Sequence, residues 1–332
     1  MNCTVLGSGT WGSSLAQVLS DNKHNVVVYG IEKTEVEDIN FNHKNSKYFG
    51  DKVNLNSDIK ATMDLTLALK DAEVIVVAVP TFAVRNILKQ IKPLLKNKPY
   101  IVSVAKGFDP DTFARMSEVI RQEIPSDLRQ EVVSLIGPGH AEEVILKLLT
   151  CITATSIDEE AGKFVQRLFS TPYFRVYVQT DEVGAEYGVA IKNAIAIASG
   201  ISQGIGMGDN AKAALATRGL VEMIRFGTKF GGKLETFMGL TGIGDLMVTC
   251  NSVHSRNYQA GYQIGIANSA TEFLSNNKKT VEGVRTAKII YKIAKENDIE
   301  MPIIEAVYSV LFEDKKPNEV VYQLMTRELK KE

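Results

Sequence analysis

The part of the chain richest in reactive side chains is residues 242–257, GIGDLMVTCNSVHSRN. Within these sixteen residues it combines an acid, Asp245, with several hydroxyls, an arginine and an asparagine. Glycines at its start allow a tight turn and let the backbone approach a ligand. Arg256 offers a planar fork of donors that suits a phosphate, and Ser255 and Asn257 flank it with further hydrogen-bonding groups. We therefore expect a loop that binds a small phosphorylated substrate.

A single charged residue, Lys192, lies inside the apolar run of residues 189–198, VAIKNAIAIA. Burying an ammonium without a partner costs several kcal/mol, so such a lysine either reaches the surface or is held at a site. This run is apolar on nearly every face of the expected helix, which leaves little surface to reach. We therefore favour a site, in which burial would adapt the amine to act as a base near neutral pH.

Two further candidate segments follow expected strands. Lys106 comes just after the strand at 101–104, and Gly137-Pro138-Gly139-His140 follows the strand at 132–136. Ligands of open α/β sheets bind beyond the carboxyl ends of the strands, so both segments should border a cofactor site. An ordinary loop lysine and an ordinary glycine-proline turn remain the alternative.

The start of the chain carries a dinucleotide-binding fingerprint, Gly7-Ser8-Gly9-Thr10-Trp11-Gly12. It follows the first expected strand directly and opens the first expected helix. The first glycine makes the turn, the second lets a pyrophosphate approach, and the third lets the helix pack on the strand. The helix N-terminus then offers its N–H groups to the phosphates.

An acid, Glu32, lies 20 residues past Gly12, where a carboxylate would bind the adenine ribose. In that role it would favour NAD over NADP, because it would repel a 2′-phosphate. Lys33 beside it could do the reverse, and Glu32 could equally be a solvated charge.

The secondary structure that must position these residues changes near residue 180, from strands alternating with helices to helices alone. Before it, short apolar runs alternate with helical patterns, which predicts βαβ units and a mostly parallel sheet. After it, helical patterns follow one another with almost no strand signal. The expected strands are 3–6, 26–29, 74–79, 101–104, 132–136, 151–154 and 174–178. The expected helices are 10–19, 84–95, 182–199, 210–230, 260–267, 285–297, 303–312 and 317–329, and residues 275–279 are expected to be a loop.

Composition excludes several classes of protein. The length of 332 residues suits two domains, and 45% hydrophobic with 23% charged residues is typical of a soluble globular protein. A net charge of −1 argues against a general nucleic-acid or membrane-surface binder. Cys3, Cys151 and Cys250 are isolated, which indicates free thiols in a reducing compartment. We see no metal-ligand spacing, signal peptide or membrane span, and expect a cytoplasmic protein.

Together the motifs resemble those of the NAD(P)-dependent glycerol-3-phosphate dehydrogenase family, bacterial type. The matching segments keep the family's order and spacing over most of the chain. They are Gly7-Ser8-Gly9-Thr10-Trp11-Gly12, Ala105-Lys106-Gly107, Gly137-Pro138-Gly139-His140-Ala141, Lys192-Asn193, residues 206–222 with Asn210 and Thr217-Arg218-Gly219, residues 242–257, and Val281-Glu282-Gly283. The resemblance implies an N-terminal Rossmann-type, doubly wound NAD(P)-binding domain at 1–180 and an all-helical substrate-binding and catalytic domain at 181–332.

The resemblance also implies an activity: reversible oxidation of sn-glycerol 3-phosphate at C2 to dihydroxyacetone phosphate by a homodimer. NAD or NADP would serve as cofactor without a metal, and reduction would supply the glycerophospholipid backbone. Lys192 would be the general acid/base in a catalytic set of Lys192, Lys106, Asp245, Asn193 and Thr249. Substrate contacts would come from Lys106, Gly137, Gly139, Lys192, Asp245, Ser255, Arg256 and Asn257. Cofactor contacts would come from Gly7, Gly9, Thr10, Trp11, Gly12, Glu32, Lys106, Ala141, Arg256 and Glu282.

The chain departs from the family pattern in three places. Gly139 stands where the family usually has Ser or Thr, so one hydroxyl contact to the substrate must be lost or replaced by the backbone or by water. Ile31 and Glu32 stand where a His or Arg often meets the 2′-phosphate of NADP, which leaves the choice between NAD and NADP open. Tyr258 stands where an Arg often follows the Ser-Arg-Asn triplet.

Two alternative functions differ from this one in the residues they require. Another dehydrogenase with a Rossmann and a helical domain, of the β-hydroxyacid type, would lack the block at 242–257. A non-catalytic dinucleotide-sensing protein would keep the glycines but lose Lys192 or Asp245, and both residues are present.

Overall fold

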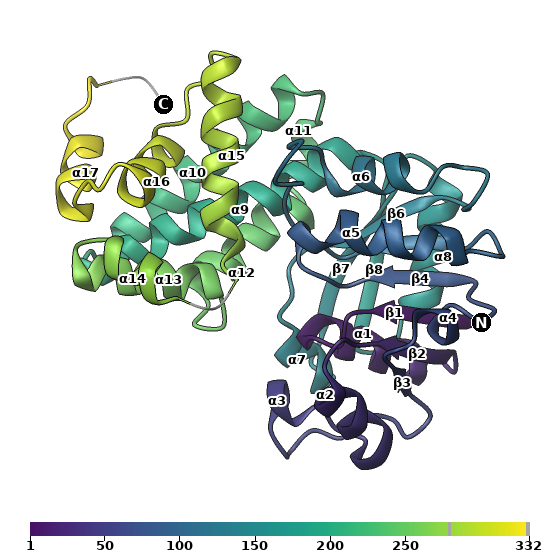
Figure 1. The fold of residues 1–332 in the computed structure, drawn as a ribbon. Helices are drawn as coiled ribbons and strands as arrows, with labels where there is room; N and C mark the ends of the chain where they lie inside the picture. The colour runs from purple at the N-terminus through teal and green to yellow at the C-terminus, as the bar shows by residue number, and fades with distance from the viewer. Residues whose placement is uncertain (278–279, 330–332) are drawn as a thin grey trace. The chain divides into compact units, whose positions relative to one another are not determined.

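The computed structural model describes residues 1–277 and 280–329. The chain divides into two compact units, one formed by Met1–Glu182 and the other running from Val183 to the end of the described chain (Figure 1). Strands occur in the first unit, and the described residues of the second unit form helices only. This division follows the change in sequence pattern near residue 180.

An eight-stranded sheet forms the centre of the first unit, in the order β3-β2-β1-β4-β5-β6-β7-β8 (Figure 1). Neighbouring strands from β3 to β6 are parallel, β7 is antiparallel to β6, and β8 is parallel to β7. The prediction of a mostly parallel sheet is therefore confirmed. The strands are β1 (Asn2–Leu6), β2 (Asn25–Tyr29), β3 (Lys60–Thr62), β4 (Val74–Val77), β5 (Tyr100–Ser103), β6 (Val132–Ile136), β7 (Thr150–Thr155) and β8 (Phe174–Gln179).

Helices cover both faces of this sheet because alternate strand residues point to opposite sides. Val5 belongs to one apolar core, which α1, α7 and α8 also build, and Leu6 belongs to the other, which α5 and α6 build. This arrangement is the doubly wound fold that the family resemblance implied, built from the βαβ units that the alternating pattern predicted. The helices are α1 (Thr10–Asp21), α2 (Lys33–Glu37), α3 (Ser46–Phe49), α4 (Leu65–Ala68), α5 (Thr81–Ile91), α6 (Met116–Glu123), α7 (Ala141–Ile145) and α8 (Glu159–Phe169), with a π-helical turn at Asp38–Asn42 between α2 and α3.

In the second unit, two of the helices cross with their backbones in contact. A β-carbon placed on Gly200 of α9 would lie 2.1 Å from the carbonyl oxygen of Tyr258, and one on Gly261 of α13 would lie 2.0 Å from that of Ile197. Only glycine permits this crossing. The helices are α9 (Glu182–Gly204, whose first residue belongs to the first unit), α10 (Asp209–Lys229), α11 (Leu234–Phe237), α12 (Asp245–Asn251), α13 (Arg256–Ala267), α14 (Thr271–Asn276), α15 (Glu282–Glu296), α16 (Pro302–Phe312) and α17 (Pro317–Met325).

The prediction that residues 242–257 form a loop is wrong. A π-helical turn at Leu240–Gly244 leads into α12, and α13 already begins at Arg256. The reason lies in Leu246 and Cys250, which are four residues apart and both buried, so one face of a helix faces the core. Only residues 252–255 connect the two helices.

Other differences are elements that were not predicted and elements whose ends are shifted. The helices α2, α3, α4, α6, α7, α8, α11 and α14 are not among those expected from the sequence. The three-residue strand β3 went unpredicted because it is too short to show a pattern, and α13 begins four residues earlier than expected. Ser275 and Asn276 end α14 instead of belonging to a loop. Asn277 follows α14 outside any helix, as expected. The last two residues of the expected loop, 278–279, and the last three of the expected helical domain, 330–332, lie outside the described residues. None of the described helices is long and apolar enough to cross a membrane.

Candidate active site

The fingerprint after β1 has the geometry that its glycines predict. Gly7 has a φ of +118°, which disfavours any side chain, and a β-carbon there would lie 2.6 Å from the carbonyl oxygen of Ala78. A β-carbon on Gly12 would lie 1.9 Å from the carbonyl oxygen of Gly7. The first and third glycines are therefore required by the turn and by the packing of α1 on β1.

The second glycine, Gly9, has a different environment. A β-carbon there would meet no atom within 4 Å, so nothing in the packing of the chain requires glycine. Gly9 is also the residue before α1, and the twelve-residue helix starts without a side-chain cap. The first N–H groups of a helix lack partners within it and attract anions, so Thr10 and Trp11 open a helix suited to a pyrophosphate. These residues fit a dinucleotide.

Glu32 follows β2 and is the residue before α2. Its side chain is exposed, as is that of Ile31. Lys33 pairs with Glu37 of the same helix, with 3.6 Å between Nζ and Oε1. The carboxylate of Glu32 therefore lies at the surface beside the exposed Lys33–Glu37 pair.

The segments after β5 and β6 meet within the first unit. The ammonium of Lys106 donates to the carbonyl oxygen of Gly137 over 2.6 Å and lies 5.9 Å from the ring centre of Trp11. A β-carbon on Gly139 would lie 3.2 Å from the same ring. Ala141 begins α7, and its carbonyl oxygen accepts a hydrogen bond from Ser14 of α1. The four sequence-predicted residues Lys106, Trp11, Gly137 and Gly139 therefore lie together.

In the second unit, Lys192 is buried and held by two groups of α12. Its Nζ lies 3.1 Å from Oδ1 of Asp245 and 2.7 Å from Oγ1 of Thr249. The Thr249 hydroxyl donates to the carbonyl oxygen of Asp245, so it presents a lone pair to the lysine. Asp245 and Thr249 are themselves 1% and 4% exposed. The arrangement is a buried ammonium paired with one carboxylate and oriented by one hydroxyl.

Cys250 lies beside this pair without reactive character. Burial raises the pKa of its thiol to about 12, and the charge of Asp245 adds to this effect while that of Lys192 opposes it. A thiol with this pKa stays protonated at neutral pH and is a poor nucleophile. The acid/base candidate at this place is therefore Lys192.

The remaining predicted residues of the second unit either link helices by hydrogen bonds or lie at the start of α13 or α15. Asn257 donates from Nδ2 to Oδ1 of Asn193 and accepts from the N–H of Gly283, both over 2.9 Å. It thereby links α9, α13 and the start of α15, where Glu282 is the first residue. Ser255 caps α13 by accepting from the N–H of Tyr258. Arg256 is the first residue of α13, and its side chain is exposed.

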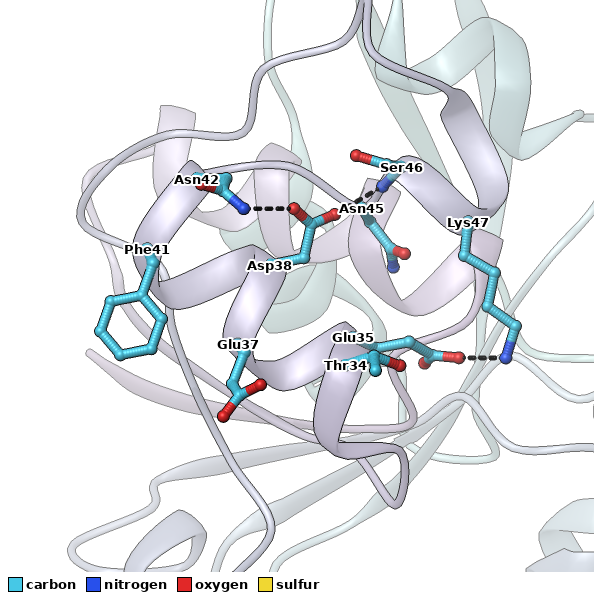
Figure 2. Close-up of a pocket in the computed structure, with 9 residues that line it drawn as sticks. All are labelled: Thr34, Glu35, Glu37, Asp38, Phe41, Asn42, Asn45, Ser46 and Lys47. Atoms are coloured by element: carbon cyan, nitrogen blue, oxygen red, sulfur yellow. Dashed lines mark hydrogen bonds and ion pairs between the residues drawn. The ribbon is translucent and has the colours of Figure 1, made fainter.

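A polar group that the sequence did not predict packs against the fingerprint. Ser8, Glu35, Asn45 and Lys47 form it, and the last three also line a cavity of about 430 Å³ between α2 and α3 (Figure 2). The signal that could have found it was Ser8 itself, a polar residue between two glycines just before α1. Nothing in the spacing of Glu35 or Asn45 marked them as its partners.

No group of three or more His, Cys, Asp or Glu residues in the described part of the chain could hold a metal ion. The candidate groups are thus the glycine-rich turn, the Lys106 contacts and the buried Lys192 pair.

Comparison with known proteins agrees with this chemistry. The family model for the N-terminus of NAD-dependent glycerol-3-phosphate dehydrogenase matches residues 2–162, and the model for its C-terminus matches residues 181–322. The glycerol-3-phosphate dehydrogenase [NAD(P)+] of Bacillus pumilus is 49% identical over 98% of this chain and 94% of its own, and that of Streptococcus sanguinis is 44% identical over 99% and 96%. The crystal structure of glycerol-3-phosphate dehydrogenase from Coxiella burnetii is 33% identical, with a TM-score of 0.90 over 98% of this chain and 99% of that one. The chain belongs to the NAD-dependent glycerol-3-phosphate dehydrogenase family.

Proposed function

We propose that the chain catalyses reversible hydride transfer between NAD(P)H and dihydroxyacetone phosphate, giving sn-glycerol 3-phosphate. The observation that carries the proposal is the buried Lys192, held between Asp245 and Thr249 in a chain that also has a dinucleotide fingerprint. Family membership supports the same reaction.

The first unit is proposed to hold the dinucleotide. The turn at Gly7, Gly9 and Gly12 and the start of α1 would bind the pyrophosphate, and Glu32 would accept from the adenine ribose. Further cofactor contacts are proposed for Thr10, Trp11, Lys106 and Ala141, and from the second unit for Arg256 and Glu282. The bound nicotinamide supplies or accepts the hydride.

The second unit is proposed to move the proton. In reduction, negative charge develops on the carbonyl oxygen at C2, and Lys192 would donate a proton to that oxygen. In oxidation the neutral amine would accept the proton from the C2 hydroxyl. Asp245 balances the charge of the ammonium, and Thr249 fixes the direction of Nζ. Asn193 is proposed to orient the substrate beside Lys192, and Lys106 to help polarise its oxygen.

Arg256 and its neighbours are proposed to bind the substrate phosphate. An exposed guanidinium at the start of a helix suits a dianion, and one such charge-assisted bond contributes about 1.5–3 kcal/mol. Ser255 would donate its hydroxyl proton while its oxygen caps α13. Asn257 would act partly through its bridge to Asn193. Substrate contacts from Gly137 and Gly139 would be through the backbone, because neither has a side chain.

Several finer features are proposed from the family resemblance. They are supply of sn-glycerol 3-phosphate for phospholipid synthesis, a cytoplasmic location and a homodimer. Cys3, Cys151 and Cys250 are free, which supports a reducing compartment. Sedimentation equilibrium of the purified protein tests the dimer, and a single species at the monomer mass would exclude it.

One assay tests the main proposal. Purified protein is mixed with dihydroxyacetone phosphate and either NADH or NADPH, and loss of the reduced-nicotinamide absorbance is followed. We expect NADH or NADPH to be oxidised in the presence of dihydroxyacetone phosphate. We expect no oxidation when the substrate is replaced by a β-keto acid without a phosphate, the compound that a β-hydroxyacid dehydrogenase would reduce. Absence of oxidation with both cofactors would reject the proposal. Faster turnover of the unphosphorylated compound would favour the β-hydroxyacid alternative.

A further inference from the structure

The residue between the first two glycines of the fingerprint points its side chain into the protein. Ser8 is 5% exposed, and its hydroxyl donates to Oε2 of Glu35 over 2.5 Å. Room for it comes from Gly30 at the end of β2, where a β-carbon would lie 2.8 Å from the Ser8 hydroxyl oxygen. A charge-assisted hydrogen bond on the buried side of the glycine turn therefore holds the turn in place.

The partner of Ser8, Glu35, is a buried carboxylate with a second bond. It lies on α2, is 4% exposed, and its Oε1 accepts from the ammonium of Lys47 over 2.5 Å (Figure 2). The hydroxyl of Tyr48 lies 3.4 Å from the same oxygen. A buried carboxylate is tolerated when a cation and hydrogen bonds compensate its charge, and Glu35 meets that condition.

A second side chain holds the backbone of the same turn. Asn45 is 1% exposed, and its Nδ2 donates to the carbonyl oxygen of Ser8 over 2.6 Å and to the hydroxyl of Ser13 over 2.8 Å. The turn is thus fixed at the side chain of Ser8 by Glu35 and at its carbonyl by Asn45.

The helix that carries Glu35 also fixes the acid proposed for the ribose. Glu32 is the residue before α2, and its carbonyl oxygen accepts from the N–H groups of Glu35 and Val36, both over 3.1 Å. Glu35 and Glu32 are therefore parts of one short helical segment, and a shift of one moves the other.

We propose that Glu35 is a positioning residue for the adenosine-diphosphate half of the dinucleotide. Through Ser8 it holds the pyrophosphate turn, and through α2 it holds Glu32. This inference rests on the proposed NAD(P)-dependent function. A turn that is fixed before binding loses less conformational freedom when the cofactor binds. Glu35 should therefore increase the affinity for the cofactor without changing the rate of hydride transfer.

The test compares three single variants of the whole protein. Ser8→Ala removes the hydroxyl, and Glu35→Gln presents an amide donor to Lys47 and weakens the anchor of α2. Glu37→Gln is the matched control, because Glu37 lies on the same helix with its side chain half exposed and paired with Lys33. Affinity for NADH and NADPH is measured by quenching of the single tryptophan, Trp11, which lies within the fingerprint. KM for each substrate and kcat are measured in parallel.

We expect Ser8→Ala and Glu35→Gln to raise Kd and KM for the reduced dinucleotide about tenfold, as for loss of one charge-assisted hydrogen bond. The value of kcat at saturating cofactor and KM for dihydroxyacetone phosphate should stay within about twofold of the unaltered protein, and Glu37→Gln should change nothing. The double variant should bind the cofactor no more weakly than the weaker-binding single variant, because both substitutions remove the same Ser8–Glu35 hydrogen bond.

Unchanged affinity in both single variants would overturn the positioning role, as would strictly additive losses in the double variant. A fall in kcat with unchanged cofactor KM would overturn it as well. These results differ from failure of the proposed function, in which the unaltered protein itself would bind neither dinucleotide.

Discussion

The buried carboxyl of Glu222 makes the stability of the second unit depend on pH. It lies on α10, is 3% exposed, and accepts from the N–H groups of Ile303 and Ile304 at the start of α16, over 2.7 and 3.2 Å. Burial raises its pKa from 4.5 to about 7, although the two N–H donors and Arg225 oppose the rise; Glu305 adds to it. The protonated form is thus favoured in the folded chain.

The sign and size of the effect follow from this pKa. A carboxyl whose pKa is higher in the folded than in the unfolded chain stabilises the fold fully below pH 4.5, and this contribution is lost as the pH rises through about 7. Each pH unit between the two values corresponds to about 1.36 kcal/mol, which gives about 3 kcal/mol over the whole interval. Between pH 5 and pH 8 the free energy of unfolding should fall by about 2–3 kcal/mol through this one group.

The assay compares urea unfolding of the protein and of Glu222→Gln at pH 5, 6, 7 and 8 at fixed salt. Glutamine cannot ionise, so the variant should lack this slope, and the difference in unfolding free energy between the two proteins should change by about 2–3 kcal/mol across the series. Glu319→Gln, an exposed change on α17, is the control and should leave the slope as it is. Parallel pH profiles for the protein and Glu222→Gln would refute the reasoning.

Three further predictions concern the proposed reaction. Lys192→Ala should lower kcat about 10²–10⁴-fold, the usual contribution of a general acid/base, with cofactor Kd unchanged; full turnover would remove Lys192 from the mechanism. Arg256→Ala should raise KM for dihydroxyacetone phosphate about 10–100-fold with little effect on kcat, because a phosphate contact is equal in ground and transition states; steady-state rates check this, and an unchanged KM would assign the phosphate elsewhere. Glu32→Ala should reduce any preference for NADH over NADPH in the ratio of kcat/KM values, and an unchanged ratio would leave Glu32 without a role in selection.

The longer strands of the first unit were predictable because their signals are local. A run such as residues 132–136 is apolar throughout, as expected of a strand buried on both faces, and the structure has the strand with these bounds. The glycine turn after β1 was likewise visible from a short motif. Strand β3 was not, because three residues with an exposed lysine at the start show no periodicity.

Contacts between distant residues could not be derived from spacing. Lys192 and Asp245 are separated by 53 positions, and only the packing of α9 against α12 brings them to 3.1 Å. The residues at 242–257 looked like a loop because glycines and polar groups dominate them, while the buried pair Leu246 and Cys250 that makes them helical is easily overlooked. Nothing in the sequence around Glu35 indicates that it is buried, and its hydrogen-bond partner Ser8 lies 27 positions earlier.

The glycine crossing of α9 and α13 fixes the distance between two backbones that carry proposed site residues. Lys192 lies on one of these helices two turns before Gly200, and Arg256 starts the other five residues before Gly261. Because backbone touches backbone at the crossing, no intervening side chain can change the distance between the two helices there. Replacing Gly200 or Gly261 even by alanine would force the helices apart and would shift the backbone of Lys192 relative to that of Arg256.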